Sequence, residues 1–252
     1  MAKTTVVGII PARYASTRLP GKALKLIAGK PMIQRVLERC QGATMLDQLC
    51  VATDDERIAR LVEAVGGHAV MTSPTHPSGT DRIAEAAREI QADIVVNIQG
   101  DQPFLDPTMI DEGVHPLLDD PALPMSTLMH PIAKEADLAD PSVVKVVVDL
   151  AGNGLYFSRS LLPYPRNNIP HKVYEHVGLY VYRRDFLFKL ASLPPTPLEQ
   201  IESLEQLRVL ENGYRIRVIE THCADNEFSG FSVDTPADLD RAEAMLRERG
   251  MT

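Results

Sequence analysis

Four cationic side chains follow the first apolar run of the sequence, in a stretch that offers little else to bury. The stretch reads IIPARYASTRLPGKAL over residues 9–24. Its cations, with the next one along the chain, are Arg13, Arg18, Lys22 and Lys25. Arginine and lysine pair with phosphate oxygens, and Ser16 and Thr17 add hydroxyl groups. The pattern predicts an anion site, with a solvated, charged connection as the ordinary alternative.

The stretch matches neither of the common phosphate-binding loops. The GxxxxGK[ST] pattern of P-loop proteins is missing, and no GxGxxG follows the first apolar run. The second absence also excludes an NAD-dependent oxidoreductase of the usual kind. Phosphate binding here must therefore differ from that of both loops.

Two carboxylates follow other apolar runs. Asp101 lies in NIQGDQPF and Asp234 in SVDTPADL. A turn is the ordinary role for Asp101, and a helix cap for Asp234, but Thr235 and Asp238 already provide that cap. Strand-end carboxylates can hold Mg²⁺, a hard ion that also binds phosphates. With the cationic loop, they predict metal-assisted phosphoryl or nucleotidyl transfer.

The second half of the chain holds weaker candidates. In the segment HVGLYVY, His176, Gly178 and Tyr180 share one face if the segment is a strand, and the glycine leaves a notch beside the two rings. A half-buried strand with a hydrogen-bonded histidine explains this feature equally well. Glu205 and Gln206 fall on the polar side of a helical pattern, where a solvated face is the usual interpretation.

Two cations of the same half have unusual positions. Lys145 lies inside the apolar run VVKVVVD, where its charge must extend to solvent or find a partner. Arg159 ends the run LYFSR and could bind a carboxylate.

Alternating apolar runs and helix-period segments position these residues, and the alternation predicts an α/β fold with a mostly parallel, doubly wound, Rossmann-like mixed sheet. Strands are predicted at 4–10, 48–54, 68–72 and 93–100, and helices at 31–40, 55–65 and 78–90. Later strands at 143–149, 154–159, 176–184 and 214–221 have short connections, which favours antiparallel pairing. A helix is predicted over 198–213, and a last one begins at Thr235. We expect one domain over 1–252, with a smaller β-rich region within about 150–195.

The composition is that of an ordinary globular protein. The chain has 252 residues, 44% of them hydrophobic and 24% charged, with a net charge of −8. This charge argues against nucleic acid or an anionic membrane as a partner. The three cysteines lack metal-ligand spacing, and no apolar stretch is long enough for a membrane span. We therefore expect free thiols and a cytoplasmic protein.

Nine segments together resemble the motif series of one enzyme family, the 3-deoxy-manno-octulosonate (Kdo) cytidylyltransferases, also called CMP-Kdo synthetases. The segments cover nearly the whole chain in the family's order, and HPSGTDR with LEQLR is the most specific combination. They are IPARYASTRLPGKAL, ATDDERI, HPSGTDRI, VNIQGDQP, VVKVVVD, LYFSR, HVGLYVY, LEQLRVLENG and VDTPADL.

The resemblance implies a nucleotidyltransferase-type α/β fold, a homodimer and a Mg²⁺-dependent reaction of CTP with Kdo. The products would be pyrophosphate and CMP-Kdo for lipopolysaccharide synthesis. It implies catalytic roles for Lys22, Asp101 and Asp234, the two aspartates as metal ligands. The implied nucleotide-binding residues are Arg13, Ser16, Lys22, Thr53, Ser78 and Arg82. The implied Kdo-binding residues are Gln99, Arg159, His176, Tyr180, Glu205 and Gln206.

One position departs from the family pattern, because Gln102 stands where a glutamate usually follows the aspartate. The change removes a negative charge beside Asp101, which we expect to weaken binding of a second metal ion. Two other functions stay open at this stage. One is a cytidylyltransferase for a related acid sugar, such as 8-amino-Kdo or a sialic acid; the other is an inactive nucleotide-binding protein of the same fold.

Overall fold

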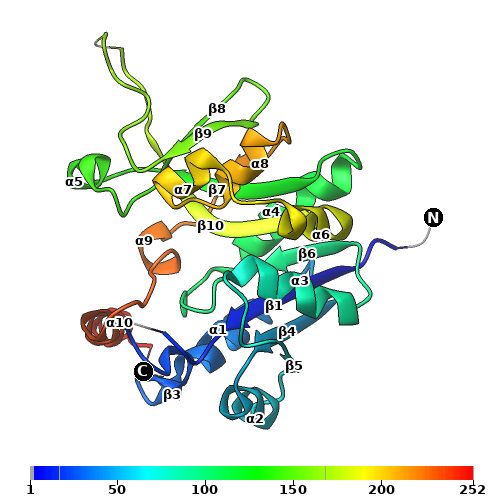
Figure 1. The fold of residues 1–252 in the computed structure, drawn as a ribbon. Coiled ribbons are helices and arrows are strands. Elements are labelled where there is room, and N and C mark those ends of the chain that lie inside the picture. The colour runs from blue at the N-terminus through cyan, green and yellow to red at the C-terminus, as the bar shows by residue number, and fades with distance from the viewer. Residues whose placement is uncertain (1–2, 17, 168, 252) are drawn as a thin grey trace. The chain divides into compact units, whose positions relative to one another are not determined.

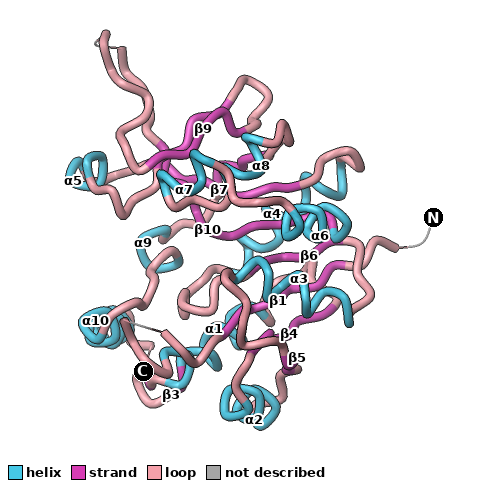
Figure 2. Tube along the Cα trace, viewed as in Figure 1, coloured by secondary structure: helices cyan, strands magenta, loops and turns pink. Residues whose placement is uncertain are grey.

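A computed structural model describes residues 3–16, 18–167 and 169–251 of the chain. The chain forms two compact units, one of residues 1–111 and 223–252 and the other of residues 112–222. The second unit contains the β-rich region expected within about 150–195 and extends beyond it at both ends. Figure 1 labels most of the helices and strands of both units, and Figure 2 colours them by type.

The first unit contains four parallel strands in the order β6, β1, β4, β5. Their bounds are Ile94–Asn97 for β6, Val6–Ala12 for β1, Gln48–Thr53 for β4 and Ala69–Met71 for β5. All four residues of β6 are buried, as expected for a central parallel strand. In register, Ala12 pairs with Thr53, so the carboxyl ends of β1 and β4 lie at one edge. Loops that leave this edge carry the predicted site residues.

The helices of this unit follow the predicted pattern closely. Side chains at the apolar period of α1 are all buried, and side-chain caps start four of the helices at Asp55, Ser78, Asp225 and Thr235. The helices are α1 (Met32–Cys40), α2 (Glu56–Ala64), α3 (Gly79–Glu89), α9 (Asn226–Ser229) and α10 (Pro236–Glu248). A short hairpin, β2 (Leu26–Ile27) and β3 (Lys30–Pro31), lies between the cationic loop and α1.

The second unit is mostly antiparallel, as the short connections predicted. Strand β7 pairs parallel with β11 and antiparallel with β10, and β10, β8 and β9 continue antiparallel. The strands are β7 (Met125–Pro131), β8 (Lys145–Val148), β9 (Gly154–Ser158), β10 (Tyr174–Arg183) and β11 (Arg217–Glu220). The helices are α5 (Glu135–Ala139), α6 (Arg184–Ser192), α7 (Pro197–Glu202) and α8 (Gln206–Glu211). Helix α4 (Pro107–Asp119) carries the chain from the first unit into the second.

The single helix predicted over 198–213 is wrong. Ser203 adopts a left-handed conformation with φ of 52°, which ends α7 and separates it from α8. The sequence has no glycine or proline next to Ser203, and the apolar period of a helix continues through this position. The elements that were not predicted at all are β2, β3, β7, α4, α5, α6 and α9.

The three cysteines, Cys40, Cys50 and Cys223, are free and buried, which confirms that they form no disulfide. Burial raises the pKa of the Cys40 and Cys50 thiols to about 12, so both stay protonated and unreactive. No helix in the described part of the chain combines the length and apolar character needed to span a bilayer.

Candidate active site

The cationic loop leaves β1 and closes on itself before it reaches Lys22. The backbone N–H groups of Ser16 and Gly21 both donate to the Tyr14 carbonyl, at 2.9 and 3.1 Å. Gly21 has a φ of 66°, and a Cβ atom there would lie 3.1 Å from the Tyr14 ring. A glycine is therefore needed where the chain turns back, and the next residue, Lys22, begins a short 3₁₀ turn.

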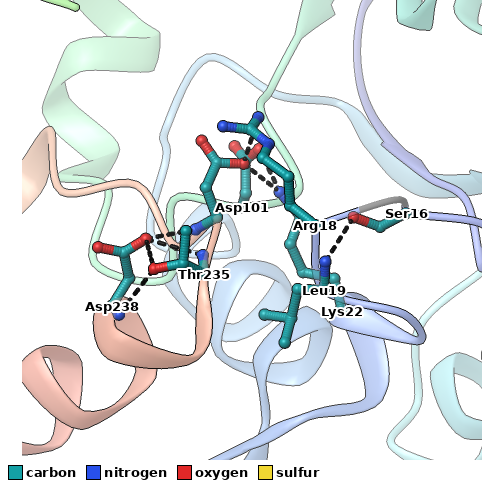
Figure 3. A network of polar contacts seen from close by, with 8 residues as sticks. Ser16, Arg18, Leu19, Lys22, Asp101, Thr235 and Asp238 are labelled. Carbon is teal, nitrogen blue, oxygen red and sulfur yellow. Dashed lines mark hydrogen bonds and ion pairs between the residues drawn. The ribbon is translucent and has the colours of Figure 1, made fainter.

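The ammonium group of Lys22 lies between the two predicted carboxylates. Its Nζ atom is 2.8 Å from Asp101 Oδ2 and 3.0 Å from Asp234 Oδ1. The Arg18 guanidinium also reaches Asp234, with Nη2 3.0 Å from Oδ1. Figure 3 shows this network, in which the aspartates come from segments far apart in the sequence. The structure therefore joins the cationic loop to both carboxylates, although Asp234 follows α9 and an irregular segment and not the strand end that the sequence predicted.

The backbone brings Asp101 and Asp234 to this point. A Cβ atom at Gly100 would lie 2.6 Å from the Pro11 carbonyl oxygen, so the turn after β6 can approach β1 only with a glycine there. The backbone N–H of Val233 then donates to the Asp101 carbonyl at 2.9 Å. These two contacts fix the turn after β6 against both the end of β1 and the segment before α10.

The Asp234 carboxylate is not needed to cap α10. Thr235 and Asp238 form a reciprocal capping box, and Asp238 Oδ2 also accepts from the Asp234 N–H at 3.0 Å. The cap therefore leaves the Asp234 carboxylate for Lys22 and Arg18, as the sequence predicted.

These side chains line a cavity of about 270 Å³. All of its lining residues belong to the first unit. Its polar lining side chains are Arg13, Ser16, Arg18, Lys22, His76, Ser78, Arg82, Gln99, Asp101 and Asp234. A cavity with several cations and two carboxylates suits a polyphosphate accompanied by a divalent ion.

The Asp101 and Asp234 carboxylates fit a magnesium ion by their chemistry. Both offer oxygen ligands, and one ammonium group reaches both, so a single cation can also approach both. Among the described residues, no group of three or more histidine, cysteine, aspartate or glutamate side chains is arranged as a complete metal cage. Magnesium commonly uses one or two carboxylates and takes its other ligands from water and substrate phosphates.

Ser78 and Arg82 lie on the cavity wall formed by the start of α3. Ser78 Oγ accepts from the Asp81 N–H at 3.2 Å, so its hydroxyl caps the helix. Arg82 is only 3% exposed and pairs with Asp54 at 2.8 Å. Thr53 is fully buried and its Oγ1 accepts from the Asp55 N–H at 3.3 Å; it is not among the lining residues. Contact of Thr53 with a nucleotide stays a prediction.

The side chains near the cavity differ from the prediction at three further positions. Arg18 lines the cavity and pairs with Asp234, whereas Lys25 is exposed and does not line it. Gln102 is 8% exposed and does not line the cavity. The missing negative charge at this position can therefore affect a bound metal ion only from a distance and not by direct contact. Thr17 lies outside the described residues.

In the second unit, Arg159 binds backbone carbonyl groups. Its Nε donates to Glu202 O at 2.7 Å and its Nη1 to Pro141 O at 2.8 Å. Among the described residues, its guanidinium forms no ion pair with a carboxylate side chain. The bonds to carbonyls orient the guanidinium, and its pairing with a carboxylate stays a prediction.

His176 and Tyr180 lie side by side, as the strand pattern predicted. Their ring centroids are 5.4 Å apart, although the register of β10 against β7 shifts between Val177 and Tyr180. His176 Nε2 lies 2.9 Å from Thr127 Oγ1, and that hydroxyl also contacts two backbone carbonyls. Because its one proton serves a carbonyl, the hydroxyl accepts from Nε2–H. Burial lowers the pKa of His176 to about 3, so the imidazole is neutral.

Gln206 is buried, which the predicted solvated helix face did not anticipate. Its side chain is 2% exposed, and its Oε1 accepts from the Tyr180 hydroxyl at 3.2 Å. Its Nε2 has no hydrogen-bond partner among the described residues. A buried amide donor without a partner is costly unless a ligand or water satisfies it. Glu205 precedes Gln206 as the N-cap residue of α8. Burial is the main reason why the pKa of Tyr180 is raised, and the negative charge of Glu205 raises it further.

The buried ammonium group of Lys145 is satisfied by hydrogen bonds to backbone carbonyls. Its side chain is fully buried, and Nζ donates to the carbonyls of Asp140, Val143 and Arg159 at 2.6, 2.8 and 3.2 Å. Burial lowers the pKa of its ammonium group. The bond to the Arg159 carbonyl fixes the end of β9, from which the Arg159 side chain extends.

Sequence reasoning missed His76 and Thr127 as well as Arg18. His76 stands in the quoted HPSGTDRI motif, and Arg18 in the cationic loop, so both were visible but received no role. Thr127 lies in β7, a strand that was not predicted, and nothing in the sequence connected it to His176.

Comparison with known proteins gives the same family as the motifs. A family model described as Cytidylyltransferase matches residues 7–216. The 3-deoxy-manno-octulosonate cytidylyltransferase of Geobacter metallireducens is 54% identical, over 96% of this chain and 97% of its own. The 3-deoxy-manno-octulosonate cytidylyltransferase of Geobacter sulfurreducens is 52% identical, over 96% of this chain and 99% of its own.

Two solved structures agree on the fold. A CMP:2-keto-3-deoxy-manno-octonic acid synthetase complexed with CTP is 46% identical, with a TM-score of 0.92 over 98% of this chain and 100% of its own. A cytidylyltransferase from Leptospira borgpetersenii is 18% identical, with a TM-score of 0.63 over 98% of this chain and 88% of its own, and shares the fold alone. The predicted α/β nucleotidyltransferase fold is confirmed. This chain belongs to the 3-deoxy-manno-octulosonate cytidylyltransferase family of nucleotidyltransferases.

Proposed function

We propose that this enzyme transfers CMP from CTP to the anomeric hydroxyl of Kdo and releases pyrophosphate. The observation that carries the proposal is the position of Lys22 between Asp101 and Asp234, in a cavity with several other cations. The names of the relatives and the CTP complex of a related synthetase support the same reaction. Together, these observations argue against the alternative of an inactive nucleotide-binding protein.

The cations of the first unit would bind the triphosphate. As the anomeric oxygen attacks the α-phosphorus, pyrophosphate leaves in line and negative charge accumulates on phosphate oxygens. Lys22, Arg13 and Arg18 line the cavity, and we expect Lys22 and Arg13 to stabilise that charge. Catalysis would come from positioning and electrostatic stabilisation by groups fixed before the reaction.

Asp101 and Asp234 would hold Mg²⁺ together with the phosphates. When bound, the ion would add positive charge beside the oxygens on which charge builds up. The protein would present two carboxylates to the ion at one point. Lys22 would then exchange these carboxylates for a phosphate of CTP as its partner.

The second unit would bind Kdo. Arg159 can pair with the sugar's carboxylate, since its own partners are neutral carbonyls. The unsatisfied Gln206 Nε2 can donate to a sugar oxygen, and Tyr180 fixes the amide that carries it. His176 and Glu205 are predicted to line the same ligand. Gln99 lines the cavity of the first unit, and its contact with Kdo stays a prediction from the family resemblance.

A homodimer is proposed from the family resemblance and one surface feature. Residues between β9 and β10 form an extended excursion in the second unit, visible in Figure 1 in yellow-green. Tyr164 and Ile169, on this excursion, are 82% and 65% exposed, as expected of side chains that a second subunit covers. A cytoplasmic location and a role in lipopolysaccharide synthesis complete the proposal.

The proposal is tested by measuring pyrophosphate release from CTP in the presence of Mg²⁺, with a panel of acid sugars as acceptors. Kdo should give a kcat/KM at least a hundredfold above that for sialic acid, and 8-amino-Kdo is the informative rival. A preference for either rival would assign the chain to a related acid sugar. Binding of CTP without pyrophosphate release from any of the three would contradict catalysis.

A further inference from the structure

His76 lines the cavity that holds Lys22, Asp101 and Asp234, yet the proposed reaction gives it no role. It lies in the segment between β5 and α3, and its side chain is 20% exposed. Its neighbours Pro77, Ser78 and Gly79 also line the cavity, so this segment forms a continuous part of the wall. A ligand in the cavity therefore meets His76 together with the start of α3.

Glu85, one and a half turns along α3, holds the His76 ring. Its Oε2 contacts His76 Nε2 in a short hydrogen bond and also accepts from the Ser73 N–H at 2.9 Å. The bond with His76 is the main reason why the pKa of Glu85 lies below its ordinary value. Because a carboxylate only accepts, Nε2 carries the proton of this bond, and Nδ1 is the ring nitrogen that can serve a ligand.

A second residue of α3, Arg82, also bonds to the segment between β5 and α3; it lies three residues before Glu85. Arg82 lines the cavity, pairs with Asp54 at 2.8 Å and donates to Thr72 Oγ1. Arg82 and Glu85 lie on the same side of the helix, and each bonds a residue of the wall segment. The polar groups of this part of the wall are thus fixed by α3 before a ligand arrives.

We propose that His76 binds CTP in this cavity and that Glu85 is its positioning residue. The inference rests on the proposed function, because it takes CTP as the ligand. It assigns a role to a residue of the HPSGTDRI motif beyond the helix cap and the arginine. Among these groups Glu85 forms its hydrogen bond to the imidazole and a weaker electrostatic interaction with Arg82, so most of its effect should vanish when the histidine is removed.

A double-mutant cycle on CTP binding tests the assignment. The variants are His76→Asn, Glu85→Gln and the double variant, with affinity for CTP and Mg²⁺ measured by isothermal titration calorimetry. Glu85→Gln keeps an acceptor for Ser73 N–H and removes the charge that orients the ring. His68→Asn and Glu89→Gln are matched controls, since both residues are exposed on the same unit.

His76→Asn should weaken CTP binding about tenfold, the loss of one good hydrogen bond, and Glu85→Gln about threefold. The double variant should bind CTP no more weakly than His76→Asn, and the KM for Kdo should stay within twofold of wild type. Unchanged CTP affinity in His76→Asn would overturn the contact. Additive losses in the double variant would overturn the positioning role of Glu85. Failure of the wild-type chain to bind CTP would refute the proposed function itself.

Discussion

Asp101 and Asp234 accept hydrogen bonds from the same ammonium group, that of Lys22, at 2.8 and 3.0 Å. Two carboxylates at one point repel each other, and a cation between them offsets that repulsion. Lys22 supplies this cation in the protein alone, and Mg²⁺ would supply it when the phosphates of CTP give Lys22 new partners. We therefore expect the three residues to act as one unit in binding and in catalysis.

Replacing either aspartate should remove most of the turnover. Asp101→Asn and Asp234→Asn keep the side-chain volume but lose the charge, and we expect kcat to fall by at least about a hundredfold. Asp240→Asn, an exposed change on α10, is the matched control and should leave kcat within twofold. Near wild-type kcat at limiting Mg²⁺ in either site variant, with an unchanged thermal melting curve, would refute its role as a metal ligand.

Lys22→Met should have opposite effects on two ligands. CTP should bind roughly ten- to hundredfold more weakly, because a charged phosphate partner is lost. In the absence of nucleotide, Mn²⁺ should bind about tenfold more tightly, because the two carboxylates lose the cation between them. Electron paramagnetic resonance measures free Mn²⁺ directly, and Lys25→Met, on an exposed neighbour that does not line the cavity, is the control. Weaker Mn²⁺ binding in Lys22→Met would contradict the competition.

His176 should make the second unit sensitive to acid. Its pKa of about 3 in the folded chain lies below the ordinary 6.5, so on acidification the unfolded chain takes up a proton that the folded chain does not. The free energy of unfolding should therefore fall below pH 6.5, by about 2 kcal/mol at pH 5. Urea unfolding of wild type and His176→Gln at pH 7.5 and 5.0 measures the difference. An equal loss of stability in both proteins would show that His176 is not the cause.

Lys145→Met should destabilise the chain although it removes a buried charge. Three backbone carbonyls lose their donor, and methionine cannot replace it, so we expect a loss of about 3 kcal/mol. Chemical unfolding measures it, with Lys189→Met, on an exposed lysine, as the control. A stability equal to wild type would mean that the bonds to the carbonyls contribute nothing beyond the cost of burying the ammonium group.

The sequence predicted the first unit and its site well, because parallel strands bring their carboxyl ends to one edge. That rule was enough to join Asp101 to the cationic loop, and the capping box at Thr235 showed that the Asp234 carboxylate was free for another role. The sequence did not distinguish Arg18 from Lys25, because both are cations within four residues of Lys22. Only the fold of the loop separates them, since Arg18 lines the cavity and Lys25 does not.

The second unit was less predictable, because its site depends on breaks in regular structure. Ser203 interrupts an apolar period that otherwise continues, and the break buries Gln206 on a helix face that looked solvated. Thr127 meets His176 through an antiparallel pairing of strands distant in sequence. Neither periodicity nor motif spacing contains that information.

Oxygen-18 labelling tests the central claim, attack by the anomeric hydroxyl of Kdo on the α-phosphorus of CTP. Kdo labelled at that hydroxyl is incubated with the enzyme, CTP and Mg²⁺, and the products are analysed by mass spectrometry. The label content of the remaining Kdo is measured in the same sample to correct for exchange with water. The account predicts labelled CMP-Kdo and unlabelled pyrophosphate. Unlabelled CMP-Kdo from labelled Kdo, or label in pyrophosphate, would contradict it.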